Sequence, residues 1–381
     1  MRVLVAPQEL KGTLTAGMAA EAIARGLRGG AEDAGLRLEL ELVPIADGGP
    51  GTVDAFVRAT GAERVETEVE DPLGRPVRAA FAAQGTRAVI EMAAASGLWR
   101  LTPGERDPLR ASTRGTGQLV SAALDRGCKE IWVGLGGSAT TDGGAGALEA
   151  LGARLLDAAG EPLPPGGAAL ARLERVELGA LEARLRGHRL VALTDVRVPL
   201  LGPSGAAAVF GPQKGASPEA VATLERALDR LHQVARRQLG RDLAGRPGVG
   251  AAGGLGYGLV LAGAELCDGF AAVAELLQLR ERIRRADLVV TAEGRLDAQT
   301  AMGKGPGALA ALAGAEGRPV VVLAGSIAPG APVGAFALVE AIGPGGLDAP
   351  LPSSAEASEA LEAAARRLTR RFPGLRPREQ D

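Results

Sequence analysis

The chain has 381 residues, 46% of them hydrophobic and 23% charged, a size that suits two domains of about 100–200 residues with buried cores. Its 43 Lys and Arg are nearly balanced by 45 Asp and Glu and form no long basic run, which disfavours binding to nucleic acid or to an anionic membrane. The two cysteines lack a CxxC partner, no apolar stretch is long enough for a membrane helix, and the apolar run in MRVLVAPQELKG is too short for a signal peptide, so we expect a cytoplasmic protein.

The chain opens with alternating strand and helix patterns. RVLVAP at 2–7 is a short apolar strand, and helical spacing follows over 15–28 with Thr15 in the N-cap position. A second strand at 37–46 runs directly into Asp47, and a second helix covers 53–60. This βαβα opening predicts a parallel sheet with functional residues at the carboxyl ends of its strands.

The middle of the chain has a denser β pattern. Its predicted elements are, in order, strands at 64–70, 77–83 and 88–92, a helix over 117–126, strands at 130–135 and 189–194, and a helix over 217–239. Ser217 as N-cap and Pro218 in the first turn mark the start of the last helix. The run GVGAAGGLGYG at 248–258 is typical of a turn entering a helix, of a hinge, or of close helix packing.

Alternating elements return near residue 285, with strands at 288–291, 320–324 and 335–342 and helices at 307–313 and 354–371. We therefore predict an α/β fold with two α/β domains. One, Rossmann- or flavodoxin-like, has a parallel sheet built from both chain ends, residues 1–65 and 286–381. The second, residues 66–285, is inserted into it, and we expect the active site in the cleft between them.

The densest functional pattern is GLGGSATTDGG at 134–144. It lies between a predicted strand and a predicted helix, so the backbone amides of Gly136 and Gly137 suit a phosphate or a carboxylate. The hydroxyls of Ser138, Thr140 and Thr141 add further donors. A tight structural turn is the alternative interpretation.

Two known phosphate-binding motifs match this sequence incompletely. Gly134-x-Gly136-x-x-Ala139, with Asp157 further on for a ribose hydroxyl, imitates a dinucleotide fingerprint and leaves an NAD(P)-dependent hydroxy-acid oxidoreductase open as an alternative. Around Lys304 the Walker A pattern lacks its first glycine and its final Ser or Thr, so we do not expect a P-loop enzyme.

Acidic residues follow several predicted strands. Asp47 and Asp195 each come directly after a strand, and Glu293, Arg295 and Asp297 share one turn after another strand. Phosphoryl transfer needs one carboxylate to accept the proton of the attacking hydroxyl and others to hold Mg²⁺. Any one of these carboxylates could instead cap a loop.

Lysine is rare in this chain. Only four of its 43 basic residues are lysines, and three of them, Lys11, Lys214 and Lys304, directly precede a glycine. Where arginine supplies most positive charge, a retained lysine indicates a position that needs a compact ammonium, for example next to a transferred phosphoryl group. Chance retention at the surface is the alternative.

These segments together resemble the bacterial glycerate kinase family. The matching stretches span nearly the whole chain: APQELKGTLTA, IADGGPGT, RGTGQLVSAALDRG, GLGGSATTDGGAGALEALGARLLDAAG, TDVRVPLLGPSGAAAVFGPQKGAS, GAAGGLGYGLVLAGAEL and ADLVVTAEGRLDAQTAMGKGP. The chain departs from the family's usual pattern at Gln8-Glu9-Leu10, at Pro50 and at Val198. The resemblance implies ATP- and Mg²⁺-dependent phosphorylation of D-glycerate, with 2-phosphoglycerate favoured over 3-phosphoglycerate as the product.

The resemblance, together with the pattern of the glycine-rich turn, predicts roles for individual residues. Those expected to be catalytic are Asp195, Lys11 and Arg295; those expected to bind substrate or phosphate are Asp47, Ser138, Lys214, Glu293, Lys304, Gly136, Gly137 and Thr140; those expected to hold the metal are Asp47 and Asp297. We expect Asp195 to orient and deprotonate the hydroxyl. The expected partners are small molecules alone, with the chain acting as a monomer or homodimer. A non-catalytic sensor of the same fold is a further alternative.

Overall fold

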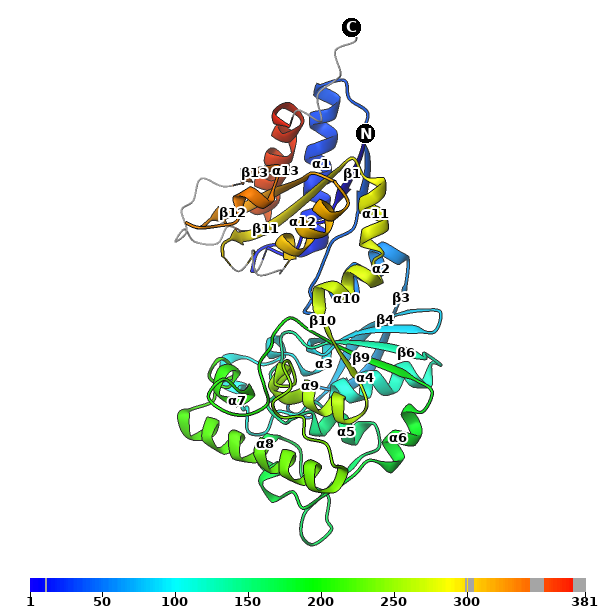
Figure 1. Ribbon diagram of the computed structural model, residues 1–381, viewed down its shortest axis with the longest axis vertical. Coiled ribbons are helices and arrows are strands. Elements are labelled where there is room, and N and C mark those ends of the chain that lie inside the picture. The colour runs from blue at the N-terminus through cyan, green and yellow to red at the C-terminus, as the bar shows by residue number, and fades with distance from the viewer. Residues whose placement is uncertain (11, 299, 301–304, 343–352, 373–381) are drawn as a thin grey trace. The chain divides into compact units, whose positions relative to one another are not determined.

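The computed structural model describes residues 1–10, 12–298, 300, 305–342 and 353–372. Its elements form a mixed α/β fold with parallel sheets, which confirms the predicted class (Figure 1). The chain divides into two compact units. Unit 1 comprises residues 1–47, 54–61 and 270–381, and unit 2 comprises residues 48–53 and 62–269. The predicted domain limits of 1–65 with 286–381 and of 66–285 stay a prediction.

The sheet of unit 1 has five parallel strands in the order β13-β12-β11-β1-β2. Their bounds are β1 Arg2–Val5, β2 Glu39–Leu42, β11 Leu288–Leu296, β12 Val320–Ile327 and β13 Leu338–Ala341. From β1 the chain proceeds to β2 on one side, whereas from β11 it proceeds to β12 and β13 on the other. The pair β1 and β11 is therefore a topological switch point, where open parallel sheets bind ligands outside the carboxyl ends of their strands.

The helices of this part of the chain are α1 Ala16–Asp33, α2 Thr52–Thr60, α10 Gly269–Leu276, α11 Leu279–Arg285, α12 Gly305–Ala315 and α13 Ser354–Arg371. The predicted N-cap is confirmed, because the Thr15 hydroxyl accepts a hydrogen bond from the Met18 amide at 3.2 Å. Helices α1 and α13 lie side by side and share one hydrophobic core with β1, β11 and β12 (Figure 1).

The sheet of unit 2 has the order β10-β9-β6-β5-β4-β3. Its strands are β3 Glu63–Glu70, β4 Pro76–Gln84, β5 Arg87–Glu91, β6 Glu130–Gly134, β9 Arg189–Thr194 and β10 Glu265–Asp268. Strands β5, β6, β9 and β10 are parallel, and β3 and β4 add an antiparallel edge. A separate antiparallel pair joins β7 Arg154–Leu156 to β8 Arg175–Glu177. The carboxyl ends of the four parallel strands thus share one edge of the sheet.

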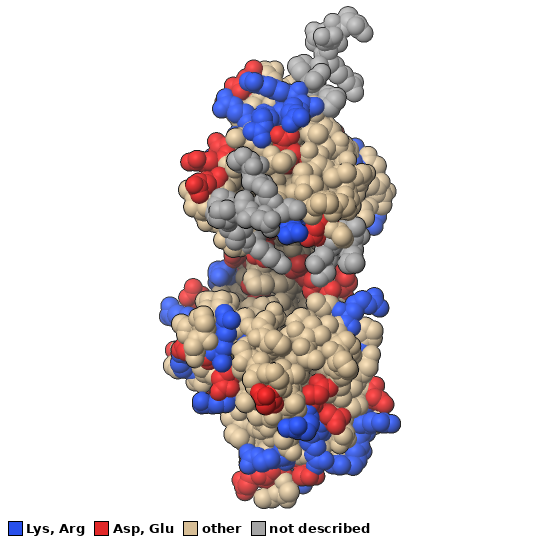
Figure 2. Space-filling view, turned by 90° about the vertical axis from the view of Figure 1, so that its left-hand side faces the viewer, with Lys and Arg blue, Asp and Glu red and all other residues tan. Residues whose placement is uncertain are grey.

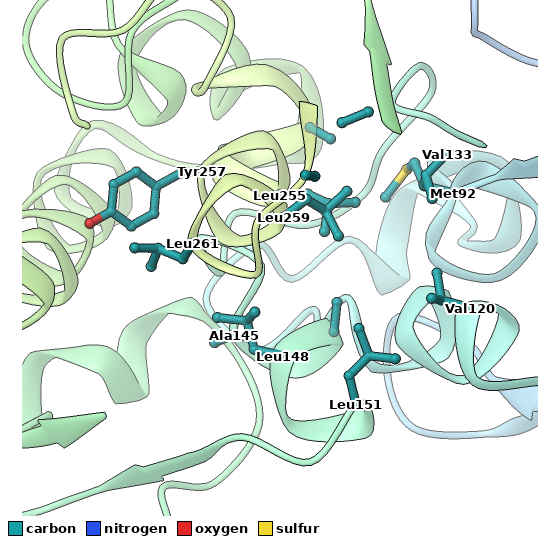
Figure 3. Packing of buried hydrophobic residues seen from close by; sticks show 14 of the residues in the cluster. Met92, Val120, Val133, Ala145, Leu148, Leu151, Leu255, Tyr257, Leu259 and Leu261 are labelled. Carbon is teal, nitrogen blue, oxygen red and sulfur yellow. The ribbon is translucent and has the colours of Figure 1, made fainter. Parts of the chain in front are cut away.

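The helices of unit 2 are α3 Ala93–Ser96, α4 Arg114–Asp125, α5 Ala145–Ala150, α6 Gly179–Leu185, α7 Ala206–Phe210, α8 Pro218–Leu239 and α9 Ala251–Leu261. Ser217 caps α8 as predicted, its hydroxyl accepting from the Ala220 amide at 3.2 Å. Figure 3 shows α9 contributing Leu255 and Leu259 to the buried cluster that also contains Met92 and Val133, next to the carboxyl end of β6.

The observed bounds of several elements differ from the predicted ones. Strand β11 continues to Leu296, five residues beyond the predicted end at 291, because its last residues pair with β12 as far as Ile327. The glycine-rich run at 248–258 contains a turn that enters a helix, one of the predicted interpretations: Ala252, Gly253 and Gly254 have left-handed backbone, and helix α9 continues to Leu261. Its glycines also pack closely against buried neighbours, which was another of these interpretations.

The surface carries both signs of charge. On the face drawn in Figure 2, basic and acidic side chains gather next to one another between broad uncharged areas. Among the described residues, none of the helices combines the length and the apolar character needed to span a bilayer.

The close contact of α1 with α13 generates a stability prediction. A Cβ atom at Gly26 would lie 2.1 Å from the Glu362 carbonyl oxygen, whereas one at Gly29 of the same helix would meet only the Arg366 side chain, at 3.7 Å. We expect Gly26→Ala to lower the free energy of unfolding by about 1–3 kcal/mol through overpacking. The matched control Gly29→Ala should leave it unchanged or raise it by about 0.5–1 kcal/mol. Urea unfolding of both variants measures this, and equal effects would contradict the packing argument.

Candidate functional site

The glycine-rich turn, residues 134–144, begins at the carboxyl end of β6 and is held by a buried carboxylate. Asp142 is fully buried and accepts hydrogen bonds from the Thr113 amide and hydroxyl at 2.8 Å each. It also accepts from the amides of Gly144 at 3.1 Å and Gly146 at 3.3 Å. Burial raises the pKa of Asp142, and these four donors act against that rise. The carboxylate therefore joins the turn to the beginnings of α4 and α5.

Lys214 reaches the same turn from a short 3₁₀ helix, Pro212–Lys214. Its ammonium is buried, with 1% of the residue exposed, and donates to the Thr140 carbonyl oxygen at 2.6 Å. Burial lowers the pKa of Lys214 to about 7, and the charge of Asp142 acts in the opposite direction. The structure thus places this predicted phosphate-binding lysine inside unit 2, in contact with the turn's backbone.

Two hydroxyls of the turn are buried beside this lysine contact. The Oγ1 atoms of Thr140 and Thr141 have no hydrogen-bond partner among the residues that the structure describes. Buried polar groups in folded proteins are nearly always paired, so two unpaired hydroxyls in adjacent residues single out this part of the turn. Both threonines were among the hydroxyl donors that the sequence predicted for the turn.

A left-handed stretch of backbone supports the turn from α9. Ala252, Gly253 and Gly254 have φ of 54°, 65° and 88°, and a Cβ at Gly253 would lie 1.9 Å from the Thr140 carbonyl oxygen. The Gly143 amide donates to the Gly253 carbonyl at 3.0 Å. A left-handed conformation costs a non-glycine residue about 1–2 kcal/mol, so Ala252 is strained where the chain packs on the turn.

The segment after Asp47 also packs against the turn. A Cβ at Gly134 would lie 2.0 Å from the Gly48 carbonyl oxygen, and one at Gly136 would lie 2.6 Å from the Gly49 Cα atom. Two glycine-rich stretches that are far apart in the sequence are therefore in backbone contact within unit 2. Glycine is required at both positions for this approach.

Asp195 follows the neighbouring strand, β9, at the same edge of the sheet. Gly134 of β6 is in register with Leu193 of β9, so Gly136 and Asp195 each follow that pair by two residues. Gly136 and Gly137 are the most accessible residues of the first half of the turn, Asp195 is half-buried, and Ser138 is 8% exposed. Unit 2 thus brings together the predicted residues Asp195, Gly136, Gly137, Ser138, Thr140 and Lys214 at one edge of its sheet.

Unit 1 gathers its own charged set at the switch point between β1 and β11. Glu293, Arg295 and Asp297 alternate along the end of β11 and its exit, which puts their side chains on one face. Asp47 follows β2, and its carboxylate accepts a hydrogen bond from the Gln8 side-chain amide at 3.0 Å. The Gln8 backbone amide in turn donates to the Ala292 carbonyl at 3.1 Å. All four predicted residues therefore lie at the carboxyl edge of this sheet.

Sequence reasoning missed two residues that organise this edge, Gln8 and Thr300. The Thr300 hydroxyl donates to the Glu293 carboxylate at 3.0 Å and accepts from the Asp297 amide at 3.4 Å. The Arg295 guanidinium lies 3.6 Å from the Asp297 carboxylate. Gln8 could have been found by its position after β1, the signal that pointed to the acidic residues. Thr300 carries no such signal.

The structure does not test the predictions made for two of the site residues. Lys11 and Lys304 lie outside the described residues. Within the described part of the chain, no group of three or more His, Cys, Asp or Glu side chains is arranged to hold a metal ion.

Asp157, the acidic residue of the dinucleotide-like pattern, has a structural contact. Its carboxylate accepts hydrogen bonds from the amides of Ala159 at 2.9 Å and Glu161 at 3.0 Å. These bonds cap the loop after β7, which belongs to the small separate sheet and not to the sheet that carries the glycine-rich turn. The geometry gives no support to a dinucleotide ribose site at this residue.

Comparison with known proteins gives matches to one family along almost the whole chain. The model of the glycerate kinase family matches residues 3–372. A protein of Bacillus subtilis (strain 168) named glycerate kinase is 45% identical over 330 residues, which are 86% of this chain and 85% of that one. A protein of Escherichia coli (strain K12) named glycerate 2-kinase is 43% identical over 331 residues, 86% of each chain. A crystal structure assigned as glycerate kinase 2 of Salmonella typhimurium LT2 matches with a TM-score of 0.86 and 40% identity, covering 98% of both chains.

The buried Lys214 ammonium generates a prediction about pH. Its pKa is about 7 in the folded chain against an ordinary value of 10.5, so the unfolded chain binds more protons between these two pH values. Stability contributed through this group therefore rises with pH across that window, because the cost of burying the charge disappears as the group loses its proton. We expect the wild type to gain stability relative to Lys214→Met as the pH is raised from 7 to 10.

Urea unfolding at several pH values measures that difference. Lys129→Met is the matched control, since Lys129 is an exposed lysine of the same unit whose ammonium contacts water in the folded and unfolded chains alike. A stability difference between wild type and Lys214→Met that stays constant over this range would show that the buried group does not titrate there.

Proposed function

Because the chain belongs to the glycerate kinase family, we propose that it transfers the γ-phosphate of ATP to D-glycerate with 2-phosphoglycerate as the product. The protein is an enzyme, a kinase acting on glycerate. The observation that supports the proposal most is the glycine-rich turn, whose backbone is fixed by Asp142 and Lys214 beside the strand end that carries Asp195. The NAD(P)-dependent oxidoreductase alternative has no support, since the relatives are kinases and Asp157 caps a loop.

We assign phosphate binding to the glycine-rich turn. Phosphoryl transfer depends mainly on positioning and on stabilising charge that spreads over the transferred group. The backbone of Gly136 and Gly137 and the hydroxyl of Ser138 supply donors without net charge, and Thr140, whose hydroxyl is buried, continues the same turn. The buried Lys214 adds positive charge behind Thr140 at 2.6 Å from its carbonyl oxygen.

Asp195 is the proposed general base. It accepts the proton from the glycerate hydroxyl as that oxygen forms a bond to the γ-phosphorus, and the bond from phosphorus to the β,γ-bridging oxygen breaks to release ADP. Its half-buried position after β9 gives it access to a small substrate while adjacent strands hold its backbone.

The charged edge of unit 1 is assigned to the metal and to the substrate carboxylate. Mg²⁺ is a hard cation that proteins usually hold through one or two carboxylates together with water and phosphate oxygens, so Asp47 and Asp297 fit it by their chemistry. There it would neutralise charge on phosphate oxygens. Arg295 can bind the glycerate carboxylate bidentately, and Glu293 completes the polar set. Lys11 and Lys304 are proposed to contact phosphate oxygens or the substrate carboxylate.

The reaction itself provides the direct test. Purified protein is incubated with MgATP and D-glycerate, and the product is followed by phosphorus NMR with enolase as a reporter. Formation of a phosphoglycerate that enolase converts would support 2-phosphorylation. A phosphoglycerate that enolase leaves unchanged would indicate phosphorylation at O3, and an absence of ATP consumption would exclude the ATP-dependent kinase.

The assignment of Asp195 generates a mutational prediction. Asp195→Asn keeps the shape of the side chain but removes its ability to accept a proton, so kcat should fall by about 10²–10⁴-fold, the usual contribution of a general base. Circular dichroism should show an unchanged fold. Asp157→Asn is the matched control in the same unit and should retain wild-type kcat. Full activity of a folded Asp195→Asn protein would remove Asp195 as the base.

A further inference from the structure

We propose that Trp99 is the platform on which the adenine base of ATP stacks, beside the glycine-rich turn. This inference rests on the proposed use of ATP and adds a base subsite to it. Trp99 is 66% exposed, and among the described residues no other exposed large apolar side chain is aromatic. The chain has only two tryptophans, and the other, Trp132, is 1% exposed. Of the two tryptophans, only Trp99 thus has an indole ring that is accessible at the surface.

The backbone next to Trp99 is hydrogen-bonded directly to the glycine-rich turn. Gly97 forms an antiparallel bridge with Ser138, and the Leu98 amide donates to the Gly137 carbonyl at 2.9 Å. The Ala139 amide donates to the Ser96 carbonyl, also at 2.9 Å. Trp99 follows the bridge by two residues, which limits the backbone separation to about 7 Å. The indole therefore lies within reach of a ligand whose phosphates bind at Gly136 and Gly137.

The indole ring is held in one orientation. Its N–H donates to the Ala93 carbonyl oxygen at 2.8 Å, and the Arg100 guanidinium lies over the ring, 4.4 Å from the ring centre. Arg100 is itself fixed by hydrogen bonds from Nε to the Ala94 carbonyl at 2.9 Å and from Nη2 to the Arg78 carbonyl at 2.8 Å. Because Arg100 covers one face of the ring, the exposed fraction comes from the opposite face and the outer edge. One flat face is available to a ligand.

The chemistry of ATP and of glycerate indicates which of these two substrates would bind to the exposed face of the indole ring. Glycerate is a small polar acid with no aromatic ring, and it gains little from contact with an indole. ATP carries a flat π-system at the end opposite its γ-phosphate. Stacking of a base on a tryptophan is favourable and does not depend on polar contacts to the base edge. A pre-oriented ring also loses little conformational freedom when the base binds.

The test separates the base from the phosphates. The full chain is titrated calorimetrically with MgATP and with inorganic tripolyphosphate, which carries the phosphates but no base. We expect Trp99→Ala to raise Kd for ATP roughly tenfold, the size usual for one stacked base, and to leave Kd for tripolyphosphate within about twofold. In the kinase assay the loss should fall on KM for ATP rather than on kcat, since stacking is equal in the ground and transition states.

Two variants serve as references. Trp99→Phe keeps a flat ring and should bind ATP nearly as well as the wild type. Val209→Ala removes another exposed apolar side chain of the same unit, 44% exposed, and should change neither ligand's affinity. If Trp99→Ala does not fold, Trp99→Phe is compared with Trp99→Leu, which keeps bulk without an aromatic ring. We then expect Kd for ATP to rise in Trp99→Leu but not in Trp99→Phe.

Three results would overturn the inference. Equal weakening of ATP and tripolyphosphate would show that Trp99 merely supports the turn. Unchanged ATP affinity in Trp99→Ala, with a wild type that phosphorylates glycerate, would remove the base subsite and leave the proposed function intact. A wild type that neither binds nor consumes ATP would refute both.

Discussion

The buried carboxylate of Asp142 is the interaction on which unit 2 depends most. It satisfies four donors from Thr113, Gly144 and Gly146, and the Thr113 hydroxyl also accepts from the Ala147 amide at 3.0 Å. A carboxylate removed from water is costly unless it is paired in this way. Once Asp142 is fixed, the path of the chain from β6 into α5 is fixed as well. The backbone that carries the exposed residues at the start of the turn is therefore rigid.

The two sheets carry different kinds of polar group at their carboxyl edges. Unit 2 offers neutral donors and a buried ammonium, whereas the carboxyl edge of unit 1 offers carboxylates and an exposed arginine. Both sets follow the carboxyl ends of parallel strands, where such sheets bind ligands. The strands fix the backbone of each group, and short polar contacts such as that of Gln8 with Asp47 fix the side chains. In the proposed reaction, the first set would bind phosphate and the second would hold the metal and the substrate carboxylate.

Sequence patterns predicted the parts of the structure that depend on local signals. The caps at Thr15 and Ser217 and the full extent of α13 follow from capping chemistry and helical periodicity. The strand end that precedes Asp195 was also predictable, because an apolar run ended there, whereas Glu293 lies within β11, which continues past its predicted end. Contacts between distant segments were not predictable. The burial of Lys214 against Thr140 joins residues 74 positions apart, and the left-handed path through Ala252 exists only because it packs on the turn.

The order of strands in unit 1 has a consequence for how the chain is made. Strand β1 is an interior strand of its sheet, yet its partner β11 begins at Leu288, and the core that covers α1 is completed only by α13. On the ribosome, the whole of unit 2 emerges before β11 does. Until β11 and α13 have been synthesised, the apolar surfaces of β1 and α1 therefore stay exposed, whereas unit 2 can already fold. Such long-range pairing slows folding and exposes nascent chains to aggregation, so the N-terminal segment is where synthesis of this protein would depend most on chaperones.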